Sequence, residues 1–249
     1  ANTIGTAIGS FLGGVIGRNN YKVTFLVQFI FCMILALLVY LMLAETIVPS
    51  NKKISFSFKK KGDTPKFFNA NLVVIFAVVI LFYFSSTSYN STINYYIEDV
   101  LNLSSTFIGG FIAISGIIGF TVNLLLTPFL TKHFNEVNVF KVVTLLLSIS
   151  LTLMVTSKNI IFFLCFALLF ASVASIHIPL QQTIITKLSH GNYGSLMGIM
   201  NSCKAVGMVS GSLSAGLIFD IYNKLPFLIG AVIVFIGFII LLFKNIREE

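Results

Sequence analysis

The sequence predicts an all-α fold, a polytopic bundle of transmembrane helices. Of the 249 residues, 57% are hydrophobic and only 10% are charged. The mean hydropathy of +0.98 is far above that of a soluble domain of this length. The apolar residues form unbroken blocks of about 17 to 25 residues, which at a rise of 1.5 Å per residue can cross a hydrocarbon layer of roughly 30 Å. These observations exclude a soluble cytosolic enzyme.

Polar residues divide the chain into eight expected spans. Most connections are a few residues long, but 44–71 is a long polar stretch with six lysines, Gly62 and Pro65, and this composition indicates a linker. The expected spans are Thr3–Gly17, Val23–Leu43, Leu72–Tyr96, Phe107–Leu130, Val139–Val155, Ile160–Leu180, Ser195–Phe219 and Leu225–Phe243.

The basic residues gather on one side of these expected spans. Of the 16 lysines and arginines, eleven lie in the linker or on its side of the membrane, four lie on the other side, and Lys204 lies within a span. Cytoplasmic loops carry an excess of Lys and Arg. We therefore expect an integral membrane protein with the linker and both termini in the cytoplasm. The net charge of +8 then implies no nucleic-acid partner.

The sequence carries no motif for catalysis or cofactor binding. The three histidines are scattered, no two cysteines or histidines have the spacing of metal ligands, and no phosphate loop, nucleophile elbow or dinucleotide fingerprint occurs. We therefore expect no enzyme activity, no cofactor and no metal. The acidic residues fall at span ends or in loops rather than inside the membrane: Glu45, Asp63, Glu98, Asp99, Glu136, Asp220, Glu248 and Glu249.

Part of the sequence repeats at an offset of 202 residues. Gly5–Gly14 aligns with Gly207–Gly216, and without a gap Phe25 aligns with Phe227. Internal repeats of this kind are typical of secondary transporters. A parallel repeat predicts that about 130 residues with four more helices precede Ala1, which gives twelve helices divided six and six by the linker.

Three segments resemble a known family. Gly5-x-x-x-Gly9-Ser10-x-x-Gly13-Gly14 is similar to the fifth-helix motif G-x-x-x-G-P-x-x-G-G of antiporters in the major facilitator superfamily, with Ser10 in place of the proline. Asn94–Ser104 resembles that family's outer loop between helices seven and eight. Pro128–Asn135 resembles a degraded copy of its basic cytoplasmic signature, with Lys132 in place of an aspartate. The chain thus resembles helices five to twelve of a drug:proton antiporter of this superfamily.

The resemblance implies a domain organisation and a set of partners. Residues 1–43 are then the last two helices of an N-terminal six-helix half, 44–71 the basic cytoplasmic linker, and 72–249 the C-terminal six-helix half. The implied partners are a small-molecule substrate, a proton or other coupling ion and the lipid bilayer. The resemblance also implies that the protein acts as a monomer in a bacterial cytoplasmic membrane.

The expected span Leu72–Tyr96 has a polar face. Tyr83, Thr87, Asn90 and Asn94 follow the i, i+4, i+7, i+11 spacing of one helix face, which is too polar to face lipid. These groups either bond neighbouring helices or line a water-filled cavity. The resemblance favours the cavity, so we take all four as candidate substrate-binding residues.

Three further polar residues are candidates for substrate binding. Lys204 lies inside its span beside Asn201, and it either snorkels to the membrane edge or serves as an anion contact, a counter-ion or a gate. His177 precedes Pro179 near the expected end of its span. There we expect a hydrogen-bonded interfacial histidine, with a proton-sensitive residue as the alternative.

Glycines form small-residue faces on two expected helices. They recur about every fourth residue, so a neighbouring helix can approach closely. They either pack helices within a bundle or, as the resemblance implies, form the contact on which the two halves rock. The candidate set for this motif is Gly5, Gly9, Ser10, Gly13, Gly14, Gly207, Gly211 and Gly216.

The sequence leaves three functions open. The first is secondary active transport, as proton-coupled efflux of amphipathic drugs or small molecules by alternating access. The second is transport of a metabolite or an organic anion by a member of the same superfamily, which Lys204 and the lack of a carboxylate inside a span favour. The third is a truncated membrane protein that does not transport.

Overall fold

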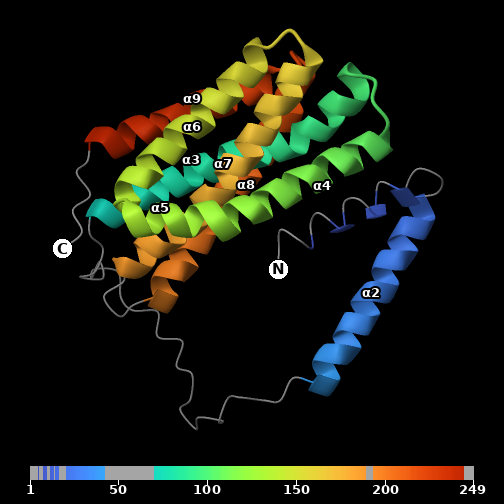
Figure 1. The fold of residues 1–249 in the computed structure, drawn as a ribbon, viewed down its shortest axis with the longest axis horizontal. Helices are drawn as coiled ribbons and strands as arrows, with labels where there is room; N and C mark the ends of the chain where they lie inside the picture. Colours follow the sequence, from blue (N-terminus) through green and yellow to red (C-terminus); the bar gives the residue numbers. More distant parts are fainter. Residues whose placement is uncertain are drawn as a thin grey trace.

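A computed structural model describes residues 21–42, 70–188 and 193–243, together with seven single positions between Gly5 and Ile16. Figure 1 shows α3 to α9 gathered in one bundle, with α2 lying apart from it. In the names below, η marks a π-helical segment. The elements are α2 (Tyr21–Met42), α3 (Ala70–Tyr95), η1 (Tyr96–Val100), α4 (Ser105–Thr121), η2 (Val122–Leu126), α5 (Thr127–His133), α6 (Glu136–Thr156), α7 (Ile160–Lys187), α8 (Tyr193–Phe219) and α9 (Leu225–Phe243).

The predicted all-α, membrane-spanning architecture is confirmed. Within the described residues, seven helical segments are long and apolar enough to cross a membrane. The eighth expected span, Thr3–Gly17, lies largely outside the described residues. The seven segments are Lys22–Met42, Ala70–Val100, Ser105–His133, Glu136–Thr156, Ile160–Lys187, Tyr193–Phe219 and Leu225–Phe243.

Polar residues cap several of these helices. Asn135 accepts hydrogen bonds from the backbone N–H groups of Val137 at 3.0 Å and Asn138 at 3.3 Å, and so starts α6. Asn159 accepts from the N–H of Ile161 at 2.9 Å and starts α7. Because the first N–H groups of a helix have no partner inside it, these side chains fix where the spans begin.

Proline affects two of the spans in different ways. Pro128 lies at the start of α5, directly after the π-helical segment η2. In η2 the continuous span formed by α4, η2 and α5 is wound more loosely. The wider turn is expected there, because proline lacks an N–H and its ring crowds the carbonyl four residues earlier. Pro179, in contrast, lies inside α7, which continues to Lys187. The prediction that this helix ends at Leu180 is therefore wrong, because packing of buried residues such as Ile185 offsets one lost backbone hydrogen bond.

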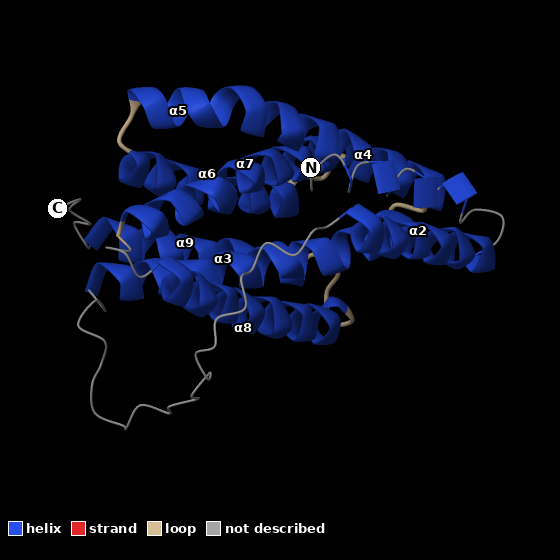
Figure 2. Cartoon of the chain, turned by 90° about the horizontal axis from the view of Figure 1, so that it is seen from below, coloured by secondary structure: helices blue, strands red, loops and turns tan. Residues whose placement is uncertain are grey.

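Helix α3 lies at the centre of the bundle. It packs against α7, α8 and α9, while α6 packs against α7 and α9, and α4 against α7 (Figures 1 and 2). Alternating helix directions give the bundle two ends. We call the end at which α6 starts the Glu136 end, and the end at which α8 joins α9 the Lys224 end. The core between the helices holds fully buried phenylalanines, namely Phe82, Phe140, Phe170 and Phe227.

Small residues and hydroxyl groups hold the helices together. A Cβ atom added at Gly230 of α9 would lie 2.8 Å from the Ser85 hydroxyl oxygen of α3. The Tyr89 hydroxyl donates to the Ala167 carbonyl at 3.2 Å, and this bond joins α3 to α7. Helices in lipid gain little from the hydrophobic effect, so close packing and hydrogen bonds of this kind supply much of their association.

Candidate functional site

Helix α7 carries two polar side chains on its buried face. His177 and Gln181 are four residues apart, so they lie on the same side of the helix, and both are completely buried. The His177 ring stacks on Phe82, with 3.9 Å between ring centroids, and lies 4.5 Å from the Phe140 ring. Neither ring nitrogen has a hydrogen-bond partner within the described residues.

The expectation of a hydrogen-bonded interfacial histidine is therefore wrong for His177. It follows from ending α7 at Leu180, whereas the helix runs on past Pro179 and keeps His177 inside the bundle. An imidazole flanked by two phenylalanine rings acts here mainly as an aromatic packing residue. Its predicted role in substrate binding stays a prediction.

Gln181 connects α7 to the polar face of α3. Its side-chain nitrogen Nε2 donates to the Tyr83 hydroxyl oxygen at 3.2 Å, and its oxygen Oε1 is buried without a partner. Lys204 of α8 approaches the same tyrosine, with its Nζ 5.0 Å from the centre of the ring. We call Tyr83, Gln181 and Lys204 the tyrosine cluster. It joins three helices, α3, α7 and α8.

The tyrosine cluster lies near the middle of the membrane-spanning segments. Tyr83 is in the fourth turn of α3 and Lys204 in the fourth turn of α8. At 1.5 Å per residue, both are roughly 16 to 20 Å from the start of their helices, in a hydrocarbon layer of about 30 Å.

Lys204 is only partly compensated at this depth. Placing a lysine at the centre of a span costs about 2.5 to 3.5 kcal/mol on insertion scales. A cation over an aromatic ring recovers about 0.5 to 2 kcal/mol, depending on how far it is desolvated. Lys187 pairs with Glu136 at 3.0 Å, and among the described residues no carboxylate forms an ion pair with Lys204. The lysine is half-buried and remains reachable from the open side of α8.

Two glycines bring Lys204 to Tyr83. A Cβ atom at Gly207 would lie 2.5 Å from the Ile80 carbonyl oxygen, and one at Gly211 would collide with the Phe84 carbonyl. Helix α8 thus touches the backbone of α3 along a stripe of small buried residues that continues to Ala215. These two glycines face α3 of the same bundle, and the predicted rocking contact between halves stays a prediction.

The other described glycines of the predicted motif do not contact a neighbouring helix closely. A Cβ atom at Gly216 would meet nothing within 4 Å, and the residue is exposed. The same open surroundings hold for Gly5, Gly9 and Gly13. Ser10 and Gly14, the other two residues of the predicted motif, lie outside the described residues.

The other three predicted site residues of α3 lie nearer the Lys224 end. Asn90 is exposed, and Thr87 and Asn94 are half-buried. Asn90 and Asn94 line a cavity of about 670 Å³ between α3 and α8, while Tyr83 is not part of it. The predicted polar face is therefore divided between the tyrosine cluster and this cavity, which also contains Ser91, Thr92, Tyr95, Asp99, Ser212, Gly216, Phe219 and Asp220.

Asn201 lies one turn before Lys204 on α8 and is exposed. Its amide is therefore available on the open side of α8, on the same helix face as Lys204. The neighbouring Ser202 hydroxyl, in contrast, donates to the Gly198 carbonyl at 3.1 Å. The structure thus brings Tyr83 and Lys204 into contact and leaves Asn201 beside them without a side-chain bond among the described residues.

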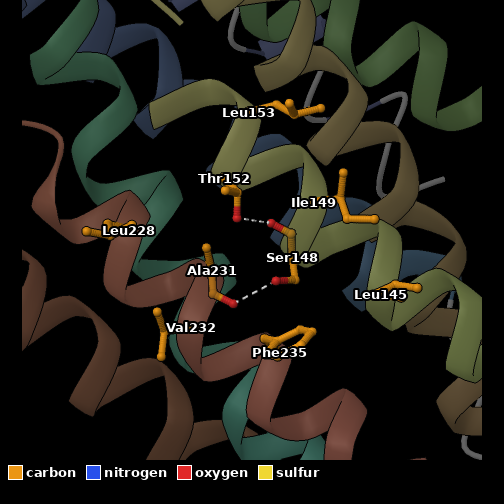
Figure 3. Close-up of a pocket in the computed structure, with 9 residues that line it drawn as sticks. All are labelled: Leu145, Ser148, Ile149, Thr152, Leu153, Leu228, Ala231, Val232 and Phe235. Atoms are coloured by element: carbon orange, nitrogen blue, oxygen red, sulfur yellow. Dashed lines mark hydrogen bonds between the residues drawn. The ribbon is translucent and has the colours of Figure 1, made fainter. Parts of the chain in front are cut away.

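Two further cavities are poor candidates for a polar ligand. A groove of about 380 Å³ lies between α6 and α9 (Figure 3). There the Ser148 hydroxyl donates to the Ala231 carbonyl at 2.9 Å and the Thr152 hydroxyl donates to the Ser148 carbonyl at 2.9 Å, so both donors are already used. A crevice of about 410 Å³ between α5, α6 and α7 is lined almost entirely by aliphatic side chains and Phe134.

Sequence reasoning does not select Gln181 as a site residue. The residue follows Pro179 and falls outside the expected span, although its spacing of four from His177 places both on one helix face. That spacing is the signal that identifies it. No group of metal-binding side chains occurs within the described part of the chain.

Comparison with known proteins identifies the family. The sequence profile of the Major Facilitator Superfamily matches residues 1–211 and residues 75–249. No curated protein matches the chain significantly. The two matched ranges together cover the whole chain, in agreement with the membrane-spanning bundle. This protein therefore belongs to the major facilitator superfamily of membrane transporters, which are not enzymes.

Proposed function

We propose that the protein is a secondary active transporter that exports amphipathic small molecules in exchange for protons. The observation that carries the proposal is the tyrosine cluster, in which Tyr83, Gln181 and Lys204 meet near mid-membrane. Polar groups at this depth are costly unless they serve a pathway or a partner. Family membership supplies the general activity of small-molecule transport across a membrane.

The surroundings of the tyrosine cluster suit an amphipathic substrate. The Phe82 ring supports Tyr83 from the core, with 5.1 Å between the ring centroids, and Met208, which is 40% exposed, presents apolar surface one turn after Lys204 on α8. Ligand sites for such compounds are mostly apolar and contain a few polar groups that fix orientation. Here the polar groups are the Tyr83 hydroxyl, the Lys204 amine and the Asn201 amide.

Proton exchange requires that proton binding and substrate binding disfavour each other. The Lys204 amine lies beside the proposed site, half-buried rather than sealed, where a substrate can reach it. Binding of a proton and binding of a substrate at neighbouring groups are coupled reciprocally, so a change in one affects the other. The proton lost or gained passes to the aqueous phase on one side of the membrane.

The proposal includes the two-half organisation of the chain. Residues 1–43 belong to the first half, 44–71 form the linker, and 72–249 form the second half, which moves against the first during alternating access. The Glu136 end faces the cytoplasm of a bacterial cell, because the basic residues gather on that side. The working unit is the monomer.

The test is substrate-dependent proton movement in proteoliposomes that contain the whole chain. A pH gradient is imposed, a panel of amphipathic dyes is added, and the internal pH is recorded. We expect at least one dye to dissipate the gradient, and Tyr83→Ala to slow this at least tenfold, while the exposed Tyr193→Ala on α8 behaves as wild type. If no dye moves protons faster than in protein-free liposomes, the proposed proton exchange is wrong.

A further inference from the structure

We infer that Lys204 and Tyr83 form a subsite for an anionic group, such as a carboxylate or sulfonate, on the transported compound. The inference rests on the proposed function, because it assigns a charge to the substrate of the same site. Its support comes from the charges and hydrogen-bond donors around the tyrosine cluster.

The first support is the unbalanced charge of Lys204. The described acidic side chains are Glu136, which pairs with Lys187, and Glu98, Asp99 and Asp220, which lie at the Lys224 end. Asp220 is 16 residues beyond Lys204 in the sequence, or roughly 24 Å at the rise of an α-helix. Within the described residues, the contact of Lys204 is therefore an aromatic ring rather than a carboxylate. An anionic ligand supplies the missing charge.

The second support is a free donor in the Tyr83–Gln181 pair. Because the Tyr83 oxygen accepts the hydrogen bond from Gln181 Nε2, its own hydroxyl proton is not used in that bond. If the amide is turned over, Gln181 accepts from Tyr83 and its amino group is the free donor instead. Either orientation leaves at least one donor without a partner, and such a donor complements the oxygen of an anion.

Tyr83 and Gln181 are buried, so their unused hydrogen-bonding groups are costly. Gln181 is completely buried and Tyr83 is 8% exposed, and the Gln181 oxygen Oε1 has no partner within the described residues. Buried polar atoms in native proteins are nearly always paired, so an unpaired one requires an explanation. An anionic ligand that reaches the Tyr83 side of the pair accepts the unused hydroxyl proton, and so satisfies the donor of the pair rather than the Gln181 oxygen.

The open side of α8 gives the ligand access. Lys204 is half-buried, Asn201 is exposed, and Met208 is 40% exposed. Asn201, Lys204 and Met208 follow the i, i+3, i+7 spacing of one helix face. Asn201 adds an amide donor for the anionic group, and Met208 adds a flexible apolar contact for the body of the compound.

The test compares two dyes with the same ring system and opposite charge. Fluorescein is anionic and rhodamine 123 is cationic, and their binding to the purified whole chain in detergent is measured by fluorescence anisotropy. We expect fluorescein to bind at least tenfold more tightly than rhodamine 123. Lys204→Gln should weaken fluorescein binding at least tenfold, and Lys204→Arg should restore most of it.

A matched control and a second variant keep the outcome interpretable. Lys158→Gln removes an exposed loop lysine and should bind both dyes as wild type does. If Lys204→Gln fails to fold, Tyr83→Phe decides: it should weaken fluorescein binding about threefold without affecting rhodamine 123. Unchanged fluorescein binding in the folded Lys204→Gln or Tyr83→Phe protein, or tighter binding of rhodamine 123 by the wild type, overturns the inference.

The result separates the inference from the proposed function. Fluorescein binding that depends on Lys204, without any dye-driven proton movement, supports the anion subsite and rejects proton-coupled export. Proton-coupled movement of rhodamine 123 that does not depend on Lys204 supports export and rejects the anion subsite.

Discussion

Two lysines of the C-terminal segment lie over aromatic rings, but their other contacts differ. Lys224, in the turn between α8 and α9, donates to the carbonyls of Val155 at 3.1 Å and Ser157 at 2.8 Å, and lies 5.9 Å from the Phe163 ring centre. Lys204 has the ring of Tyr83 and no hydrogen bond among the described residues. The comparison teaches that a lysine with satisfied donors holds helices together, whereas one with unused donors is available to a ligand.

The contacts of Lys224 explain its structural role. The carbonyls that it binds lie at the end of α6, where the last carbonyls of a helix have no partner within it. Its ammonium thus fixes the α8–α9 turn to the end of α6. Burial in this turn lowers the pKa of the Lys224 amine.

The largest expected effect comes from a substitution that displaces α8 from α3 and so breaks the contact between Lys204 and Tyr83. Gly211→Leu forces a side chain into the Phe84 carbonyl and pushes α8 off α3, which takes Lys204 away from Tyr83. We expect a loss of about 3 kcal/mol in unfolding free energy, as for severe overpacking, together with loss of fluorescein binding. Gly216→Leu on the same helix is the control, because its Cβ would meet nothing within 4 Å. Equal behaviour of the two variants in thermal unfolding contradicts the account of this contact.

Replacing Lys224 tests whether this lysine stabilises the fold without taking part in ligand binding. Lys224→Gln loses two charge-assisted hydrogen bonds at a partly solvated site, so we expect a loss of about 1 to 2 kcal/mol in unfolding free energy. Fluorescein binding should stay within twofold of wild type. Chemical unfolding in detergent measures the unfolding free energy, and anisotropy measures fluorescein binding. A large loss of fluorescein binding would mean that Lys224, like Lys204, takes part in ligand binding.

The lowered pKa of Lys224 adds a pH dependence with a definite sign. The folded state binds this proton less tightly than the unfolded state, whose pKa is near 10.5. Unfolding free energy should therefore rise with pH between the lowered pKa and about 10.5, because the unfolded chain then binds more protons. The difference between wild type and Lys224→Gln isolates this rise in a pH series of unfolding curves. A difference that falls with pH in that window contradicts the assignment.

Removing the Tyr83 hydroxyl measures how much the Tyr83–Gln181 hydrogen bond beside Lys204 contributes to stability. Tyr83→Phe keeps the ring beneath Lys204 but leaves the buried Gln181 amide without its bond, so we expect a loss of about 1 kcal/mol in unfolding free energy. Thermal unfolding of this variant and of Tyr193→Phe, at an exposed tyrosine, gives the comparison. Equal stability of the two variants would mean that the Tyr83–Gln181 bond adds nothing to the fold.

The smallest expected effect concerns an ion pair far from both lysines. Lys187 and Glu136 join the end of α7 to the start of α6, and their side chains are 51% and 11% exposed. Because the lysine is largely solvated, the pair is screened, and Glu136→Gln should change unfolding free energy by less than about 1 kcal/mol and should not alter dye binding. A larger loss in chemical unfolding would mean that burial of Glu136, rather than solvation of Lys187, sets the contribution of this pair.

The sequence predicts the spans well because hydropathy depends on each segment alone. Seven expected spans are found with modest shifts at their ends, and Leu225–Phe243 matches the prediction without change. The end of α7 is predicted wrongly, because a helix stop inferred from Pro179 takes no account of the tertiary packing that keeps the helix intact. The same error removes Gln181 from the candidate site.

The candidate site is predicted only in part because it depends on how each helix is rotated about its axis. Periodicity groups Tyr83 with Asn90 and Asn94 on one face of α3. The structure instead joins Tyr83 to Lys204 and places both asparagines in a separate cavity. That choice follows from where Gly207 and Gly211 let α8 touch α3, which no single-helix pattern contains.

The most direct test of the central claim is the rate of proton-driven fluorescein transport in Lys204→Gln relative to Lys224→Gln. Both variants lose one lysine, and the rates are measured in proteoliposomes at equal amounts of folded protein under the same pH gradient. The account predicts that Lys224→Gln transports fluorescein within twofold of the wild-type rate and that Lys204→Gln falls to the rate of protein-free liposomes. Equal transport by the two variants would contradict it.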